Sequence, residues 1–187
     1  ENMLPEIFIH AGFHKPHPDA HYNISITPKM SFGTGHHQTT YLMMEEMLHI
    51  PFAEKVVTDF GTGTGVLAIL AEKLKCSKVL AIDYDEWCIE NARENIIENG
   101  AQHIELKQAD VFIPQPADII LANINLNVIT ENLQSMLGAL KPGGILLLSG
   151  MLLQDENYIL KTLQSYQCNN ITVKHRGNWI MVRINKD

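Results

Sequence analysis

Two glycine-rich stretches contain the residues of this sequence that are best suited to chemistry. The first, "SFGTGHHQTT", spans residues 31–40 and includes two adjacent histidines, and the second, "DFGTGTG", spans residues 59–65. Imidazoles bind metal ions, and glycine-rich loops let backbone N–H groups approach a phosphate. These residue types leave three possibilities open: a metal site, a phosphate site, or a loop that holds another ligand.

The second stretch does not match the common phosphate-binding loops. A dinucleotide-binding loop has the pattern G-x-G-x-x-G or G-x-G-x-x-A, but the last position here is Val66. A P-loop requires Gly-Lys-Ser/Thr after its glycines, which this sequence lacks. Asp59 precedes Gly61, and its carboxylate would repel a pyrophosphate but attract an ammonium group. These features favour a ligand with an amine and no pyrophosphate.

A second carboxylate, Asp83, lies 24 positions after Asp59 and ends an apolar run that predicts a strand. An acidic residue at this place in a nucleotide-binding sheet accepts hydrogen bonds from ribose hydroxyls. We assign that role to Asp83, and we assign the capping of the following helix to Asp85. S-adenosylmethionine has a ribose and an amine but no pyrophosphate, so it fits both carboxylates.

The histidines do not form a convincing metal site. No carboxylate or cysteine at ligand spacing accompanies His36 and His37. Four earlier histidines are spaced as if to line one face of a helix: His10, His14, His17 and His21. Gly12, Pro16 and Pro18 exclude a helix there, so we expect these histidines in loops or strands and predict no bound metal.

The hydrophobic pattern predicts a framework in which strands alternate with helices. Core strands are predicted at 55–60, 78–83, 103–110, 116–124, 145–150, 170–175 and 179–184. Helices are predicted at 39–50, 65–75, 85–100, 127–140 and 155–166. Short β-like runs precede them at 6–13 and 21–28, and "KPGG" at 141–144 is expected to separate a helix from a strand. This order is typical of an α/β fold with a doubly wound, mostly parallel sheet, here ending in an antiparallel hairpin.

Polar residues follow four of the predicted strands in succession. The glycines of 61–65 follow the first core strand, Asp83 ends the second, Asp110 ends the third and Asn123 ends the fourth. Ligands of such sheets bind beyond the carboxyl ends of the strands, near the point where the strand order reverses. We therefore expect these residues to converge on one site.

The composition excludes several classes of function. The 187 residues fit one domain, and the formal charge of −7 leaves no broad basic face, so we expect no direct nucleic-acid binding. No apolar run approaches the ~20 residues that span a bilayer, so no membrane association is expected. The cysteines Cys76, Cys88 and Cys168 match no metal or redox spacing. We interpret them as small buried apolar residues in a reducing compartment, the cytoplasm.

With these residues identified, the chain resembles the class I S-adenosylmethionine-dependent methyltransferases. The segments "DFGTGTGVLAI", "AIDYDEWCIENARENI", "ILANINLNV" and "LKPGGILLLSG" carry the resemblance. The more specific segment "FGTGHHQTT" is similar to the PrmA family, which methylates the eleventh protein of the large ribosomal subunit. The resemblance implies the Rossmann-like, seven-stranded class I methyltransferase fold. It also implies an N-terminal β segment and cofactor lid at 1–38, followed by the methyltransferase core at 39–187.

The resemblance further implies that the segment at 31–40 folds over the cofactor. Matching residue by residue gives four cofactor-binding positions, Thr40, Gly61, Asp83 and Asn123. The lid segment adds Thr34 and Gly35, and the arguments from the glycine loop and the strand ends add Asp59, Gly63 and Asp110. The two glycine-rich stretches are thus expected to hold one cofactor between them.

The implied reaction is methyl transfer to amino groups, namely lysine side chains and the N-terminal amine, of a large-subunit ribosomal protein. Asn123 is the candidate catalytic residue, because its amide could accept a hydrogen bond from the amine or hold the methionine end of the cofactor. "ANIN" at 122–125 lacks the Pro-Pro-aromatic sequence that stacks on a flipped base, which argues against a nucleobase target. Asn125 and Asn127 are predicted to cap the next helix.

Three other interpretations stay open from the sequence. One is another class I N-methyltransferase with a small-molecule or nucleic-acid substrate, and another is a non-catalytic cofactor-binding module. The third, a nicotinamide-dependent oxidoreductase, is disfavoured by Val66 and Asp59. Members of the PrmA family carry a separate N-terminal substrate-recognition domain, and too little chain precedes the core here to form it. We therefore expect cofactor binding without efficient docking of the protein substrate.

Overall fold

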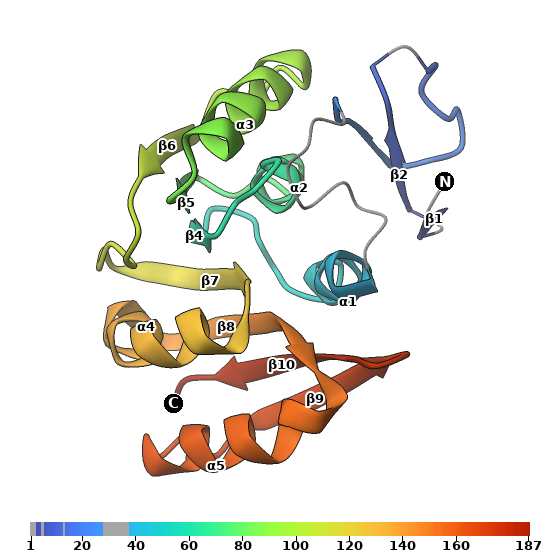
Figure 1. The fold of residues 1–187 in the computed structure, drawn as a ribbon. Coiled ribbons are helices and arrows are strands. Elements are labelled where there is room, and N and C mark those ends of the chain that lie inside the picture. The colour runs from blue at the N-terminus through green and yellow to red at the C-terminus, as the bar shows by residue number, and fades with distance from the viewer. Residues whose placement is uncertain (1–2, 5, 13, 28–37) are drawn as a thin grey trace.

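Seven strands form one sheet at the centre of the molecule. The computed structural model describes residues 3–4, 6–12, 14–27 and 38–187. The strands are β4 (Val56–Phe60), β5 (Lys78–Asp83), β6 (Ile104–Gln108), β7 (Ala117–Asn123), β8 (Leu140–Leu152), β9 (Ile171–Arg176) and β10 (Trp179–Asn185). Their order is β6-β5-β4-β7-β8-β10-β9, with the first five parallel and β10 antiparallel to both neighbours (Figure 1). The predicted doubly wound, mostly parallel sheet with its antiparallel hairpin is confirmed.

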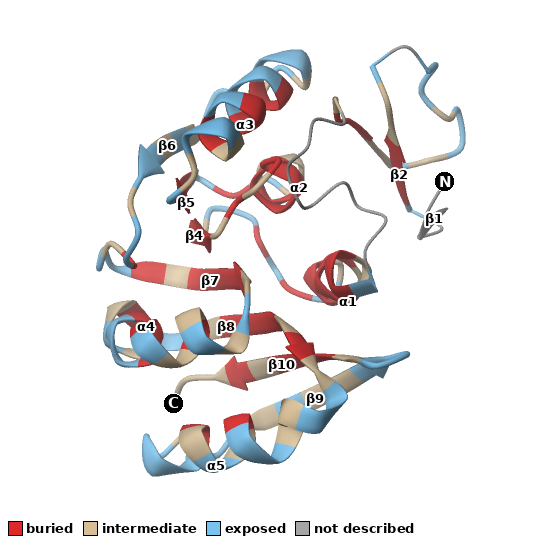
Figure 2. Cartoon of the chain, in the orientation of Figure 1, coloured by how far each residue is buried: buried red, intermediate tan, exposed pale blue. Residues whose placement is uncertain are grey.

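Helices cover both faces of this sheet. They are α1 (Gln38–Met47), α2 (Val66–Lys73), α3 (Glu86–Glu98), α4 (Leu126–Ala139) and α5 (Glu156–Ser165), with a short 3₁₀ turn at Leu153–Asp155. One apolar cluster lies between α1, α2 and one face of the sheet, and a second lies between α4, α5 and the other face. Central strands such as β4 and β7 are largely buried, whereas the edge strands β6 and β9 are more exposed (Figure 2). Parallel strands covered on both faces explain why their sequences are almost continuously apolar.

Two strand boundaries differ clearly from the sequence prediction: β6 ends at Gln108, so Asp110 follows the strand instead of ending it, and β8 is longer than predicted. Strand β8 already begins at Leu140, and residues 141–144 bulge out of its pairing with β7 instead of separating a helix from a strand. The bulge contacts two distant parts of the chain. The Asp118 carboxylate on β7 accepts from the Lys141 ammonium at 3.1 Å as well as from the Val56 N–H at 2.8 Å. The Gly143 N–H donates to the Lys186 C=O and the Lys186 N–H to the Gly144 C=O, both at 2.9 Å, and local propensity could not indicate these long-range contacts.

A small second sheet precedes the core. It consists of β1 (Met3–Leu4), β2 (Ile7–His10) and β3 (Tyr22–Ser25), with β1 antiparallel and β3 parallel to β2. This confirms the two predicted β-like runs. Ile7, Ile9 and Ile24 bury themselves in the same apolar cluster as α1 and α2. The small sheet therefore packs against the core.

A row of asparagines on α3 attaches this small sheet to the core. Its members lie four residues apart on one face of the helix: Asn91, Asn95 and Asn99. The Asn99 side chain bonds the N–H and the C=O of Ser25, at 2.9 and 2.7 Å. The Asn95 Oδ1 accepts from the Thr27 N–H at 2.9 Å, and its Nδ2 donates to the Thr64 C=O at 2.9 Å. Asn95 thus joins the segment that follows β3 to the glycine-rich loop.

Replacing this central asparagine is expected to be costly. Asn95 is fully buried, so Asn95→Ala leaves the Thr27 N–H and the Thr64 C=O without their side-chain partner. We expect the free energy of unfolding, measured with urea, to fall by about 2–4 kcal/mol. The control is Glu90→Ala on the exposed face of α3, expected to stay within about 0.5 kcal/mol of wild type. Equal changes in the two variants would show that the Asn95 hydrogen bonds contribute no net stability.

Candidate functional site

The glycine-rich loop follows β4 where the strand order of the sheet reverses, between β4 and β7. The N–H groups of Gly61 and Thr62 both donate to the Ile82 C=O, at 2.8 and 2.9 Å, and so tie the loop to β5. Gly61 has a φ of 77°, and a side chain there would collide with Ile124. Gly65 is the N-cap residue of α2. The loop therefore lies at the topological switch point, as predicted.

Asp83, at the end of β5, is fixed against this loop. Its Oδ2 accepts from the Gly63 N–H at 2.8 Å, and its Oδ1 accepts from the Asp85 N–H at 3.0 Å. The side chain of Asp85 caps α3 by accepting from the Trp87 N–H at 2.8 Å, which confirms the predicted cap. These two N–H groups occupy two of the roughly four acceptor positions of an ionised carboxylate, and Asp83 is 6% exposed.

Asp59 lies beneath the loop. Only 1% of it is exposed. Its Oδ2 accepts from the Thr62 hydroxyl at 2.6 Å, and its Oδ1 is buried without a hydrogen-bond partner among the described residues. Burial raises the pKa of Asp59 to about 7 and the nearby charge of Asp83 adds to the rise, whereas interactions with the Thr62 hydroxyl and the Ala68 N–H oppose it. The site therefore contains a buried carboxylate that a nearby positive charge would stabilise.

Asn123 and Thr40 meet although 83 positions separate them in the sequence. Asn123 ends β7, and its Nδ2 donates to the Thr40 Oγ1 at 3.3 Å. Thr40 lies in the first turn of α1 and is 1% exposed, whereas Asn123 is half-buried. The hydrogen bond directs the amide nitrogen toward α1, so the Asn123 Oδ1 is the atom left to accept from a ligand.

Two exposed apolar side chains that the sequence did not single out lie next to the carboxylates at the end of β5 and just after β6. Asp110 is exposed on the loop after β6, and its neighbour Val111 is 58% exposed. Tyr84, next to Asp83, is 72% exposed, and its C=O accepts from the Gln108 side chain at 3.1 Å. A large apolar residue directly after a carboxylate at or just beyond a strand end is the signal that could have identified both Tyr84 and Val111. Together they offer apolar surface beside the two carboxylates.

Several predicted residues lie elsewhere or outside the described chain. Gly33, Thr34, Gly35, His36 and His37 fall outside the described residues, so the lid prediction stays untested. His10 ends β2, and the other three early histidines lie in the loop before β3, as predicted. Within the described ranges, no group of three His, Cys, Asp or Glu side chains could hold a metal ion.

Asn125 caps α4 through the Val128 N–H, but the prediction that Asn127 also caps is wrong, because α4 has already begun at Leu126.

The cysteines are not reactive thiolates. Burial raises the pKa of Cys76 to about 12 and that of Cys88 to about 11, and it also raises the pKa of Cys168. Only Cys76 is fully buried, so the expectation of three buried cysteines is wrong for Cys88 and Cys168, which are half-buried. All three are free thiols with no sign of a catalytic environment.

Two hollows lie away from the predicted site. One, of ≈ 170 Å³, is lined by residues that include Val56, Lys78 and His103 at the amino ends of β4, β5 and β6. The other, of ≈ 510 Å³, includes Pro116 and Lys186. Neither hollow is lined by any of the predicted site residues, so neither coincides with the predicted site.

Among the described helices, none is long and apolar enough to cross a membrane.

Comparisons with known proteins agree with this geometry. The family described as "Ribosomal protein L11 methyltransferase (PrmA)" matches residues 3–187. The ribosomal protein L11 methyltransferase of Bacteroides fragilis is 36% identical to this chain over 94% of its length. That of Porphyromonas gingivalis is 38% identical over 96% of its length. The chain covers 64% and 63% of those proteins, less than two thirds of their length.

A solved structure leads to the same family. The crystal structure of a ribosomal protein L11 methylase from Lactobacillus delbrueckii subsp. bulgaricus superposes with a TM-score of 0.91 at 27% identity, covering 100% of this chain and 98% of that one. Sequence, topology and the residues at the switch point are thus consistent with one another. The chain belongs to the PrmA family of ribosomal protein L11 methyltransferases.

Proposed function

We propose that this chain is the catalytic part of an S-adenosylmethionine-dependent protein N-methyltransferase that modifies lysine side chains and the N-terminal amine of ribosomal protein L11. The observation that carries the proposal is the Asp83 carboxylate, held by the Gly63 and Asp85 N–H groups at the switch point of the sheet. A substrate of this kind implies a cytoplasmic location. The formal charge of −7 supports a protein partner over direct nucleic-acid binding.

The residues at the switch point suit this cofactor. Beyond the two N–H groups that bond it among the described residues, the Asp83 carboxylate has acceptor capacity for ribose hydroxyls. Tyr84 and Val111 offer apolar surface for the base beside Asp110. The Asp59 Oδ1, which has no hydrogen-bond partner among the described residues, lies beneath the glycine-rich loop. The two neighbouring carboxylates Asp59 and Asp83 favour a cationic ligand there. Thr34 and Gly35 are proposed to contribute from the preceding segment.

Methyl transfer requires the protein mainly to align the accepting amine with the cofactor. When bound, S-adenosylmethionine supplies an electrophilic methyl group on a cationic sulfur. The accepting amine must be neutral, which for a lysine of pKa ~10.4 costs about 4.6 kcal/mol at pH 7. With its Nδ2 bonded to Thr40, Asn123 presents Oδ1 as an acceptor for an amine or for the methionine end of the cofactor. The role of Asn123 is thus to orient a reactant, which accelerates a displacement by fixing its geometry.

A titration tests the proposal against the oxidoreductase alternative. S-adenosylhomocysteine and NAD would each be titrated into the purified chain by calorimetry. We expect saturable binding of S-adenosylhomocysteine with one ligand per chain and no binding of NAD. Binding of NAD alone would contradict the proposal. Transfer of labelled methyl groups from S-adenosylmethionine to purified ribosomal protein L11 would then test the substrate.

Thr40→Val is expected to weaken S-adenosylhomocysteine binding by about three- to tenfold, because a net hydrogen bond contributes about 0.5–1.5 kcal/mol. The substitution keeps the shape of the side chain but removes the Oγ1 that accepts from Asn123. Thr39→Val, one position earlier on α1 and also buried, is the matched control and should weaken binding less. Equal dissociation constants for the two variants would mean that Thr40 does not orient Asn123.

A further inference from the structure

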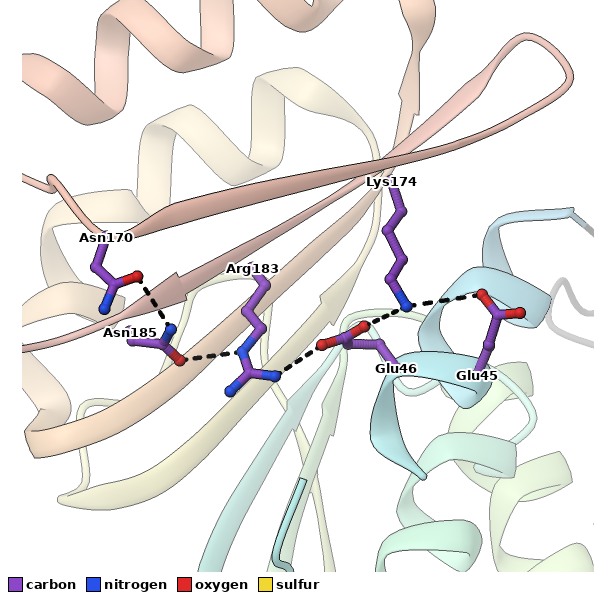
Figure 3. A network of polar contacts seen from close by, with 6 residues as sticks. All are labelled: Glu45, Glu46, Asn170, Lys174, Arg183 and Asn185. Atoms are coloured by element: carbon purple, nitrogen blue, oxygen red, sulfur yellow. Dashed lines mark hydrogen bonds and ion pairs between the residues drawn. The ribbon is translucent and has the colours of Figure 1, made fainter. Parts of the chain in front are cut away.

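Helix α1 carries a buried carboxylate that the proposed reaction does not use directly. Glu46 lies near the end of α1 and is 4% exposed. Its Oε1 accepts from the Arg183 Nη1 at 2.8 Å, and its Oε2 is 2.7 Å from the Lys174 Nζ (Figure 3). Arg183 belongs to β10 and Lys174 to β9, so one carboxylate joins α1 to both strands of the C-terminal hairpin.

These contacts keep Glu46 charged. Burial by itself would raise the pKa of Glu46, but the hydrogen bonds and positive charges of Lys174 and Arg183 outweigh it and lower the pKa. Asn185 accepts from the Arg183 Nε at 3.0 Å and helps to orient the guanidinium, and Asn170 in turn accepts from Asn185 at 3.3 Å (Figure 3). The ion pairs are therefore directional and set in a hydrogen-bonded network.

The hairpin contacts α1 at a second place. The guanidinium of Arg176, at the end of β9, lies 3.5 Å from the centroid of the Tyr41 ring. Tyr41 directly follows Thr40, so this cation–π contact lies beside the residue that bonds Asn123. Lys174 and Arg176 are two residues apart on β9 and face α1 together.

The apolar face of α1 is rich in methionine. Its buried residues include Met43, Met44 and Met47, and methionine side chains adapt to shifts in their surroundings. Ion pairs with defined geometry on a strand can fix both the rotation and the axial position of a helix. Thr40 and Glu46 are about 9 Å apart along this helix, so a helix held at Glu46 carries Thr40 with it.

We propose that Glu46 is a positioning residue whose ion pairs with Lys174 and Arg183 hold α1 so that Thr40 stays against Asn123. This inference rests on the proposed function, since its consequence is cofactor affinity. The C-terminal hairpin, which contributes none of the predicted cofactor-binding residues, thereby sets the geometry of the site through α1.

The test is a double-mutant cycle on S-adenosylhomocysteine affinity, measured by calorimetry well below the melting temperature of every variant. We expect Glu46→Gln to weaken binding about fivefold in the wild-type background and less than about twofold in the Thr40→Val background. Glu45→Gln is the matched control, because the Glu45 carboxylate lies 3.9 Å from Lys174 on the exposed side of α1. It should change affinity less than about twofold.

A loss of stability alone should not reproduce this result. Ile159→Val, in the core of α5 on the opposite face of the sheet, should lower the melting temperature without changing affinity. If Glu46→Gln does not fold, Lys174→Gln replaces it in the cycle, because Arg183 still pairs with Glu46 in that variant. We then expect a two- to threefold loss of S-adenosylhomocysteine affinity that disappears in the Thr40→Val background.

The outcomes separate the two proposals. A wild-type chain that does not bind S-adenosylhomocysteine would overturn the proposed function. A wild-type chain that binds, together with unchanged affinity in the Glu46 and Lys174 variants, would overturn only the positioning role. Equal losses with and without Thr40 would also overturn it, because Glu46 would then act independently of Thr40.

Discussion

Asp83→Asn is expected to weaken S-adenosylhomocysteine binding at least tenfold, because hydrogen bonds to a charged group contribute about 1.5–3 kcal/mol each. The substitution replaces one acceptor oxygen with a donor, and the remaining oxygen is shared between the loop and the ligand. In wild type the Gly63 and Asp85 N–H groups each donate to one carboxylate oxygen, and the amide offers only one oxygen to both. We therefore also expect a moderately lower melting temperature. Calorimetric titration of the folded variant measures the affinity.

Asp85→Asn is the matched control for Asp83→Asn. Asp85 lies two residues further along and caps α3, a role in which asparagine is as good as aspartate. Its affinity for S-adenosylhomocysteine and its melting temperature should both stay close to those of wild type. Unchanged affinity in Asp83→Asn would show that the ribose is bound elsewhere, whatever happens to stability.

Asp59 is expected to make the chain less stable as the pH rises from about 4 to about 7. Its pKa is about 7 in the folded chain, against about 3.8 for an ordinary aspartate, so the folded chain keeps a proton that the unfolded chain has lost. This contribution is fully present below about pH 4 and is lost as the pH rises through 7. Its full size is about 4 kcal/mol, from about 1.36 kcal/mol for each unit of pKa.

Asp59→Asn should remove that pH dependence. The amide cannot ionise, so urea unfolding at pH 4, 5.5 and 7 should show a much smaller decline in the free energy of unfolding than in wild type. Asp118→Asn is a control of opposite sign, because the Val56 N–H and Lys141 outweigh burial and lower the pKa of Asp118. Asp118 stabilises the fold above its unfolded pKa, so its contribution is lost as the pH falls. Parallel pH profiles for wild type and Asp59→Asn would exclude a raised pKa at Asp59.

Much of the fold could be predicted from the sequence, because the signals are local. Apolar runs such as that of β7 identified strands buried on both faces, and Asp85 and Asn125 marked the starts of α3 and α4. The pairing of Asp83 with the glycine loop followed from strand ends that a parallel sheet brings to one edge. These predictions needed only periodicity, capping chemistry and the general topology of doubly wound sheets.

The tertiary structure alone decided how the remaining groups are partnered. The Thr40–Asn123 hydrogen bond, the Asn95 link between Thr27 and Thr64, and the ion pairs of Glu46 each join segments far apart in the sequence. No local propensity encodes such contacts, because they depend on which side chains packing brings together. Packing also excludes water from Asp59, and this burial raises the pKa of its carboxyl. The sequence therefore determined which residues lie at the switch point, and the packing around them determined their charge and orientation.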